Sequence, residues 1–246
     1  MLNTFSYNEY TSIINWVKSK YPIMGFEDIN PNISKFCVIR HDVEFSVDRS
    51  LQLAQLEHEL GIQTTYLFQI RNNSYNIFSG ENIEKITQIH SLGHKIGLHV
   101  HCSAINNYNS ISDMILNDID IMSKMLNIDV NIFSFHRPNL GILIQNLYIP
   151  KLINTYSDLF FHPYKADTPQ VLKVKYIADS NHMWKYGYPT TVNNNKLQLN
   201  FHPFSWTKEG HENTKNFQTL IGEKNNEVIK TLSDEIKTFP ESLKNI

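Results

Sequence analysis

Short apolar, β-rich runs alternate with segments of helical periodicity along most of this chain. The expected strands cover residues 35–40, 64–68, 95–100, 131–135, 158–161, 174–178 and 197–201. The expected helices cover residues 7–19, 51–60, 81–92, 111–126 and 216–237. Strands that alternate with helices pair in parallel, because each helical crossover returns the chain to the same end of the sheet. The pattern therefore predicts an α/β fold, either a doubly wound sheet or a (β/α) barrel.

Length and charge restrict the classes of partner. A chain of 246 residues, 41% of them hydrophobic, can bury one sizeable core, and we expect a single domain over residues 1–246. The formal net charge is −2 and no run of Lys or Arg stands out, so a nucleic-acid partner is not expected. The sequence shows no membrane span and no secretory signal pattern, which predicts a cytoplasmic protein. The oligomeric state stays open.

Residue types that bind metal ions stand at the ends of four of the expected strands. They are Asp42 and Glu44 at the first strand, His99 and His101 at the third, His136 at the fourth, and His202 at the last. Side chains two residues apart on an extended backbone point the same way, so Asp42 and Glu44 should face one side together. The same holds for His99 and His101. Because ligands bind at the carboxyl ends of parallel strands, these residues predict a site for a divalent ion such as Zn²⁺.

The same residues have ordinary structural interpretations as well. An acidic pair after a strand is typical of a helix cap or a solvated loop, and histidines at strand ends are often simple polar residues. The coincidence of four strand ends favours a metal site over these alternatives. A phosphate site is disfavoured, because no Gly-rich loop follows any expected strand.

Five short segments, in order, resemble the motifs of the polysaccharide deacetylases, the NodB-homology or carbohydrate esterase 4 group. They are RHDVEFS (40–46), GHKIGLHVHCS (93–103), HRP (136–138), ADSNHMW (178–184) and LNFHP (199–203). The likeness is greater to a branch found in surface-polysaccharide gene clusters. It implies a distorted (β/α) barrel of about seven strands. It also implies a divalent ion, commonly zinc, held by one carboxylate and two histidines.

The resemblance implies roles for four residues in proton transfer. By motif position, Asp42 would be the catalytic base and His202 the general acid. Arg137 and Asp179 would orient the base and the acid, respectively. The expected reaction is hydrolysis of an N-acyl group, N-acetyl in the first place, from an amino sugar of a surface polysaccharide or its precursor.

The resemblance implies Glu44 and His99 as metal ligands. Glu44 stands where the family usually has Asp, and its longer side chain must shift the ion or the backbone. The position of the family's second metal histidine is Ser103 here. His101, on the same strand face as His99, is expected to replace it.

Substrate contacts are expected from His136, Trp184 and Trp206. The two indole rings suit stacking on a sugar face, although Trp206 fits a core position equally well. The sequence leaves another acyl group, such as formyl, open. It also leaves open a glycan-binding or scaffolding protein that keeps the barrel without the metal.

Overall fold

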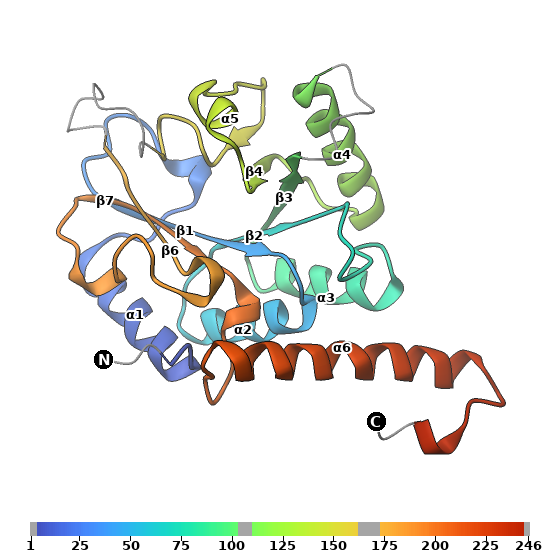
Figure 1. Cartoon of the computed structure of the whole chain (residues 1–246). Helices are drawn as coiled ribbons and strands as arrows, with labels where there is room; N and C mark the ends of the chain where they lie inside the picture. Colours follow the sequence, from blue (N-terminus) through green and yellow to red (C-terminus); the bar gives the residue numbers. More distant parts are fainter. Residues whose placement is uncertain (1–3, 103–109, 162–172, 244–246) are drawn as a thin grey trace.

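The computed structural model describes residues 4–102, 110–161 and 173–243 (Figure 1). Its strands are β1 (Phe36–Val43), β2 (Thr65–Phe68), β3 (Lys95–His101), β4 (Ile132–His136), β5 (Ile153–Asn154), β6 (Lys175–Ala178) and β7 (Lys196–Phe201). Its helices are α1 (Tyr7–Lys20), α2 (Val47–Glu59), α3 (Gly80–Ser91), α4 (Ile111–Leu126), α5 (Leu140–Ile144) and α6 (Asn213–Glu235).

The seven strands pair in parallel and form one sheet in the order β5-β4-β3-β2-β1-β7-β6. This is the cyclic order of a (β/α) barrel that is open between β5 and β6, the two edge strands of the described residues. The expected α/β architecture, a distorted barrel of about seven strands, is confirmed. Because all strands run the same way, their carboxyl ends lie at one end of the barrel.

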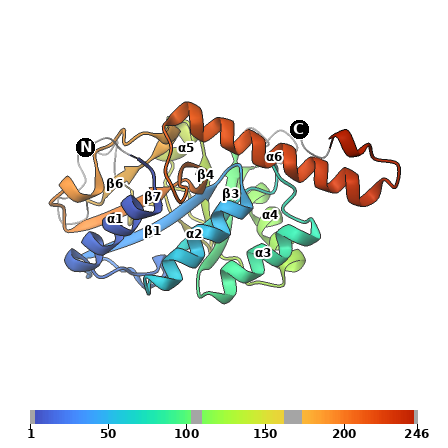
Figure 2. The same ribbon diagram turned by 90° about the horizontal axis from the view of Figure 1, so that it is seen from below.

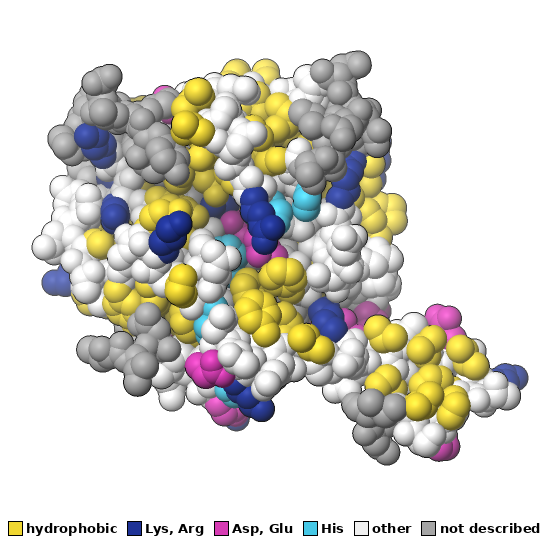
Figure 3. Space-filling model, viewed as in Figure 1, with side chains coloured by type: hydrophobic (Ala, Val, Ile, Leu, Met, Phe, Trp, Pro, Cys, Tyr) yellow, Lys and Arg dark blue, Asp and Glu magenta, His cyan; other side chains and the backbone are white. Residues whose placement is uncertain are grey.

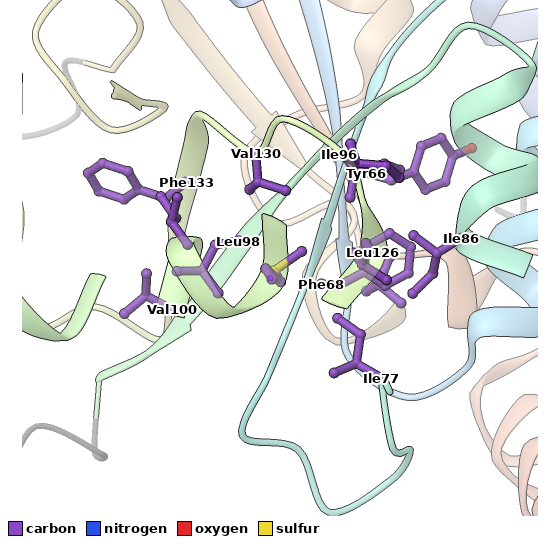
Figure 4. Packing of buried hydrophobic residues seen from close by; sticks show 14 of the residues in the cluster. Tyr66, Phe68, Ile77, Ile86, Ile96, Leu98, Val100, Leu126, Val130 and Phe133 are labelled. Atoms are coloured by element: carbon purple, nitrogen blue, oxygen red, sulfur yellow. The ribbon is translucent and has the colours of Figure 1, made fainter. Parts of the chain in front are cut away.

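Helices cover the outer face of the sheet and bury its apolar side chains. Figure 4 shows Ile96, Leu98 and Val100 of β3 in the same cluster as Ile86 of α3 and Leu126 of α4. All five side chains are buried. The spacing of two residues on the strand is what directs all three β3 side chains into this layer.

Helix α6 runs across the N-terminal ends of α2 and α3 (Figures 1 and 2). The guanidinium group of Arg49 in α2 pairs with both carboxylate oxygens of Glu223 at 2.8 and 2.9 Å. Farther along α6, Lys230 bonds to Glu81 of α3 at 2.6 Å. None of the helices in the described ranges is both long and apolar enough to cross a membrane.

Successive side chains of β1 alternate between the barrel interior and the helix layer. Phe36 and Val38 pack in a cluster inside the barrel, whereas Ile39 packs in the cluster that includes α1. By the same alternation, Asp42 faces the interior and His41 faces the helices. One strand therefore supports polar groups in two separate environments.

On the helix side, the carboxylate of Glu57 in α2 is fully buried and accepts four hydrogen bonds. The donors are the hydroxyls of Tyr10, Tyr66 (2.7 Å) and Thr64 (2.8 Å) and Nε2 of His41 (3.0 Å). Burial by itself would raise the pKa of Glu57, but His41 and the other donors outweigh it and lower that pKa to about 2. Glu57 is therefore an ionised group that ties α2 to the sheet.

Two sequence expectations need correction. The first strand extends past residue 40 to Val43, because the polar side chains of this part find buried partners. The expected strand at 158–161 is wrong, since the N–H groups of Phe160 and Phe161 bond back to the carbonyl of Ser157 and close a turn. The fifth strand is the two-residue β5, which lies just before this turn.

Candidate metal-binding and catalytic site

The carboxyl ends of β1, β3, β4 and β7 surround a cavity of about 470 Å³. Histidine, acidic and basic side chains gather near the middle of the face shown in Figure 3. The polar and aromatic residues of the lining include Asp42, Glu44, His99, Arg137, Tyr156, Tyr176, Asn200 and His202. The residues expected from four separate strand ends thus do meet at one place.

Three potential metal donors lie together here: Glu44 and His99, which line the cavity, and His136 next to them. Oε1 of Glu44 is 2.8 Å from Nδ1 of His136 and 3.7 Å from Nε2 of His99. The two ring nitrogens are 3.3 Å apart. Ligands at zinc bond lengths in tetrahedral geometry are separated by about 3.4 Å. The three donors therefore fit around one small divalent ion.

Hydrogen bonding orients His99 for this purpose. The hydroxyl of Ser134 donates to Asp42 at 3.3 Å, so its oxygen accepts from Nδ1 of His99 at 2.6 Å. This bond uses Nδ1 and leaves Nε2 as the ring nitrogen that faces Glu44 and His136. Such support of a histidine ligand through its other nitrogen is usual in metal sites.

The backbone around Glu44 is held from the loop after β2. The side-chain amide of Asn72 donates to the carbonyl of Glu44 at 2.8 Å. The hydroxyl of Tyr75 donates to the carbonyl of Val43 at 2.8 Å. Glu44 lies one residue beyond the end of β1, and these two bonds fix its position there.

Asp42 is buried beside the three donors, and both of its carboxylate oxygens accept hydrogen bonds. Its Oδ1 accepts from Nη1 of Arg40 at 2.9 Å, and its Oδ2 accepts from the amide of Asn200 at 2.8 Å. Burial raises the pKa of Asp42, but Arg40 and the nearby histidines outweigh this and lower it. Asp42 is therefore an ionised carboxylate at neutral pH.

Two tyrosines complete the surroundings of Arg40. Its Nη2 donates to the hydroxyls of Tyr156 at 2.9 Å and Tyr176 at 3.5 Å. The guanidinium carbon lies 4.7 Å from the centre of the Tyr156 ring. Burial raises the pKa of both phenols, so they stay protonated. These contacts hold the fully buried Arg40 in one orientation against Asp42.

On the other side of the cavity, His202 is bonded to Asp179. Nδ1 of His202 lies 2.6 Å from Oδ1 of Asp179, and Nε2 faces Glu44 at 3.9 Å. Burial disfavours the charged ring, but Asp179 and the other carboxylates raise the pKa of His202 to about 9. The expected partnership of Asp179 with His202 is thus present, with a proton on Nε2 directed into the cavity.

The two tryptophans lie outside the cavity, contrary to the expected substrate contacts. Trp206 is fully buried, and its indole N–H donates to Oδ2 of Asp179 at 2.6 Å. Trp184 packs on the same core cluster. Both rings fill the layer beneath α1, because apolar aromatic surface is more favourably buried there than exposed at a rim. Trp206 contacts the site through its hydrogen bond to Asp179.

Arg137 was expected to orient Asp42. In the described part of the structure, the two residues make no contact. Arg137 lines the cavity from an exposed position after β4, and Arg40 makes the contact instead. His101 is not part of the three-donor group. Its ring centre is 5.1 Å from that of His136, beside the cluster. Ser103 lies outside the described residues.

Sequence reasoning missed Arg40, Ser134 and Asn200 as site residues. Arg40 is two residues before Asp42, so the alternation of strand side chains was a signal for it. Ser134 and Asn200 stand opposite His99 and Arg40 in the neighbouring strands. Their proximity depends on strand register, which the sequence pattern does not give.

Family models and curated proteins give no match to this chain. Among solved structures, it is similar to a carbohydrate esterase 4 (CE4) esterase from Streptococcus mutans, with 11% identity and a TM-score of 0.44 over 89% of this chain and 91% of that one. The CE4 domain of a multidomain xylanase from the hindgut metagenome of Trinervitermes trinervoides gives 12% identity and a TM-score of 0.43, covering 82% and 85%.

A CE4 family pseudoenzyme from Bacillus anthracis is similar at 13% identity, with a TM-score of 0.41. That match covers 80% of this chain but only 63% of the pseudoenzyme, so this chain spans less than two thirds of its length. The values describe a distant likeness of fold.

Proposed function

We propose that this protein is a metal-dependent hydrolase that removes an N-acyl group, N-acetyl in the first place, from an amino sugar. The proposal rests on one observation: a set of metal donors, a candidate base and a candidate acid occur together at one cavity. Glu44, His99 and His136 form a donor set for one ion. Asp42 and His202 line the same cavity as an ionised carboxylate and a protonated imidazole.

The donor set differs from the sequence expectation in one ligand. His136 replaces His101 in the proposed site, because Nδ1 of His136 lies 2.8 Å from Glu44 and 3.3 Å from Nε2 of His99. One carboxylate and two imidazoles leave a coordination position open, as catalytic zinc sites do. A divalent ion bound there, zinc as the first choice, would lower the pKa of a water and polarise the acyl carbonyl.

The residues on either side of the donor set supply the proton transfers. Asp42, kept ionised by Arg40, accepts the proton of the attacking water. His202, kept protonated by Asp179, gives its Nε2 proton to the leaving amine. A base and an acid whose surroundings push their pKa values apart are what such a reaction needs at neutral pH.

A second candidate is a glycan-binding protein that uses the same cavity without catalysis. It is favoured by the direct contact of Glu44 with His136 at 2.8 Å, which holds the two side chains together without an ion. The aromatic lining, which includes Tyr156, Tyr176 and Tyr186, suits sugar binding in either case.

Metal analysis of protein purified without chelator separates the two candidates. We expect close to one zinc ion per chain after zinc addition, and a loss of binding in Glu44→Gln. A content below about 0.2 ion per chain that does not rise with added zinc would refute the enzyme.

Hydrolysis is then tested on a panel of N-acetylated and N-formylated amino sugars and oligosaccharides by amine release. Asp42→Asn should keep its zinc and lose at least about 100-fold in rate, the usual contribution of a general base. Asp120→Asn, an exposed change on α4, is the control and should keep full activity. Equal rates for Asp42→Asn and wild type would exclude Asp42 as the base.

A further inference from the structure

Arg137 directly follows β4 and lines the cavity with an exposed side chain. Its backbone has φ of 48°, in the left-handed region that residues other than glycine rarely adopt. The next residue is Pro138, which further restricts the conformations open to Arg137. An unfavourable backbone conformation of this kind at the rim of a cavity often serves a functional side chain.

The role that the motif position implies for Arg137 is performed by another residue. Arg40 is fully buried and donates from Nη1 to Asp42 at 2.9 Å. Within the described ranges, no carboxylate lies within ion-pair distance of Arg137. Its guanidinium group is therefore available to a ligand in the cavity.

The charges of the cavity favour an anionic ligand. Arg137 is the single Lys or Arg among the described residues that line it. Arg40 neutralises Asp42 from behind the cavity wall. Glu44 would balance only half the charge of a divalent ion, so the site with its ion would be cationic, and Arg137 adds to this.

We propose that Arg137 binds an anionic group, a carboxylate or a phosphate, on the amino-sugar substrate close to the amide that is hydrolysed. This rests on the proposed function and narrows its substrate class to acidic or phosphorylated amino sugars. A guanidinium group matches both anions, because its planar fork donates two parallel hydrogen bonds.

The test is calorimetric titration of the full chain with matched sugars, first after chelation and then with zinc restored. The probes are N-acetylglucosamine, its 1-phosphate and 6-phosphate, and N-acetylmuramic acid. We expect at least one anionic sugar to bind about tenfold more tightly than the neutral sugar, the effect of one charge-assisted hydrogen bond. The preference should shrink as salt is raised.

Variants assign the preference to Arg137. In Arg137→Gln, the affinities for the anionic and the neutral sugars should differ by no more than about twofold. Arg137→Lys should keep part of the preference for the anionic sugar. Lys185→Gln removes the same charge from an exposed position that does not line the cavity, and it should behave as wild type. A preference that survives in Arg137→Gln overturns the proposal.

Failure of this proposal can be told apart from failure of the proposed function. Zinc content and amide hydrolysis are measured on the same preparation. If the wild-type chain holds zinc and hydrolyses amides but binds no anionic sugar more tightly than the neutral sugar, the role of Arg137 is refuted. The proposed function then still stands. An anion preference that depends on Arg137 in chelated protein supports that role even where hydrolysis is absent.

Discussion

Replacing Glu57 by glutamine should destabilise the protein strongly at neutral pH and flatten its response to acid. The buried carboxylate accepts four hydrogen bonds, among them those from Tyr66 at 2.7 Å and Thr64 at 2.8 Å. Glutamine keeps one acceptor oxygen and presents an N–H₂ group to donors on the other side. At least two hydrogen bonds to a charged group are lost, each worth about 1.5–3 kcal/mol, so the expected cost is about 3–6 kcal/mol.

The lowered pKa of Glu57 gives an independent magnitude. Its value falls from 4.5 to about 2 on folding, which corresponds to about 3 kcal/mol of stability at pH 7. A depressed pKa stabilises the fold above pH 4.5, and this contribution is lost as the pH falls towards 2. About 2 kcal/mol of it should be gone at pH 3. His94, whose pKa burial lowers from 6.5, also disfavours the folded state in acid.

Urea unfolding followed by circular dichroism at pH 7, 4.5 and 3 measures both effects. The gap in unfolding free energy between wild type and Glu57→Gln should be largest at pH 7 and narrower by about 2 kcal/mol at pH 3. Glu59→Gln, an exposed change on the same helix, serves as the control. The reasoning is refuted if the difference in unfolding free energy between the two proteins stays constant with pH, or is under about 0.5 kcal/mol at pH 7. Glu57 would then not stabilise the fold as an ionised group.

Smaller substitutions test the supports of the site separately. Gly97→Ala places a methyl group 2.7 Å from the carbonyl oxygen of Ile132, and unfolding measurements should show a loss of at least about 2 kcal/mol or insoluble protein. Ser134→Ala removes the bond that orients His99, and zinc titration should give an affinity about 10-fold to 100-fold lower. His101→Ala should keep the zinc affinity of the wild type. A loss of affinity as large as that expected for Ser134→Ala would place His101 among the ligands.

The strands of this fold were predictable because buried parallel strands are short apolar runs between helices. The exceptions have physical causes. Two adjacent aromatic residues, Phe160 and Phe161, have strand-like character in sequence, but hydrogen bonds to Ser157 wind them into a turn. The real β5 has two residues, Ile153 and Asn154, too few to show any periodicity.

The sequence predicted which residues belong to the site better than it predicted which of them contact one another. Alternation along one strand placed Asp42 correctly with the interior, and it also places Arg40 there. It also put Glu44 on the same side as Asp42, and both side chains line the cavity although Glu44 lies beyond the end of β1. The third donor, His136, comes from a different strand and stands opposite His101 in the register of β3 and β4. Contacts between strands depend on register and twist, which no single run of residues encodes.

The position of β1 in the sheet has a consequence for how the protein is made. One edge of β1 pairs with β2, which follows soon after it, but the other pairs with β7, whose residues 196–201 are synthesised much later. Throughout that interval, a nascent chain carries a hydrophobic strand with one open edge, a target for aggregation or chaperone binding. Asn200 lies in β7 and His202 directly follows it, so the pocket around Asp42 can assemble only after these late residues have been synthesised.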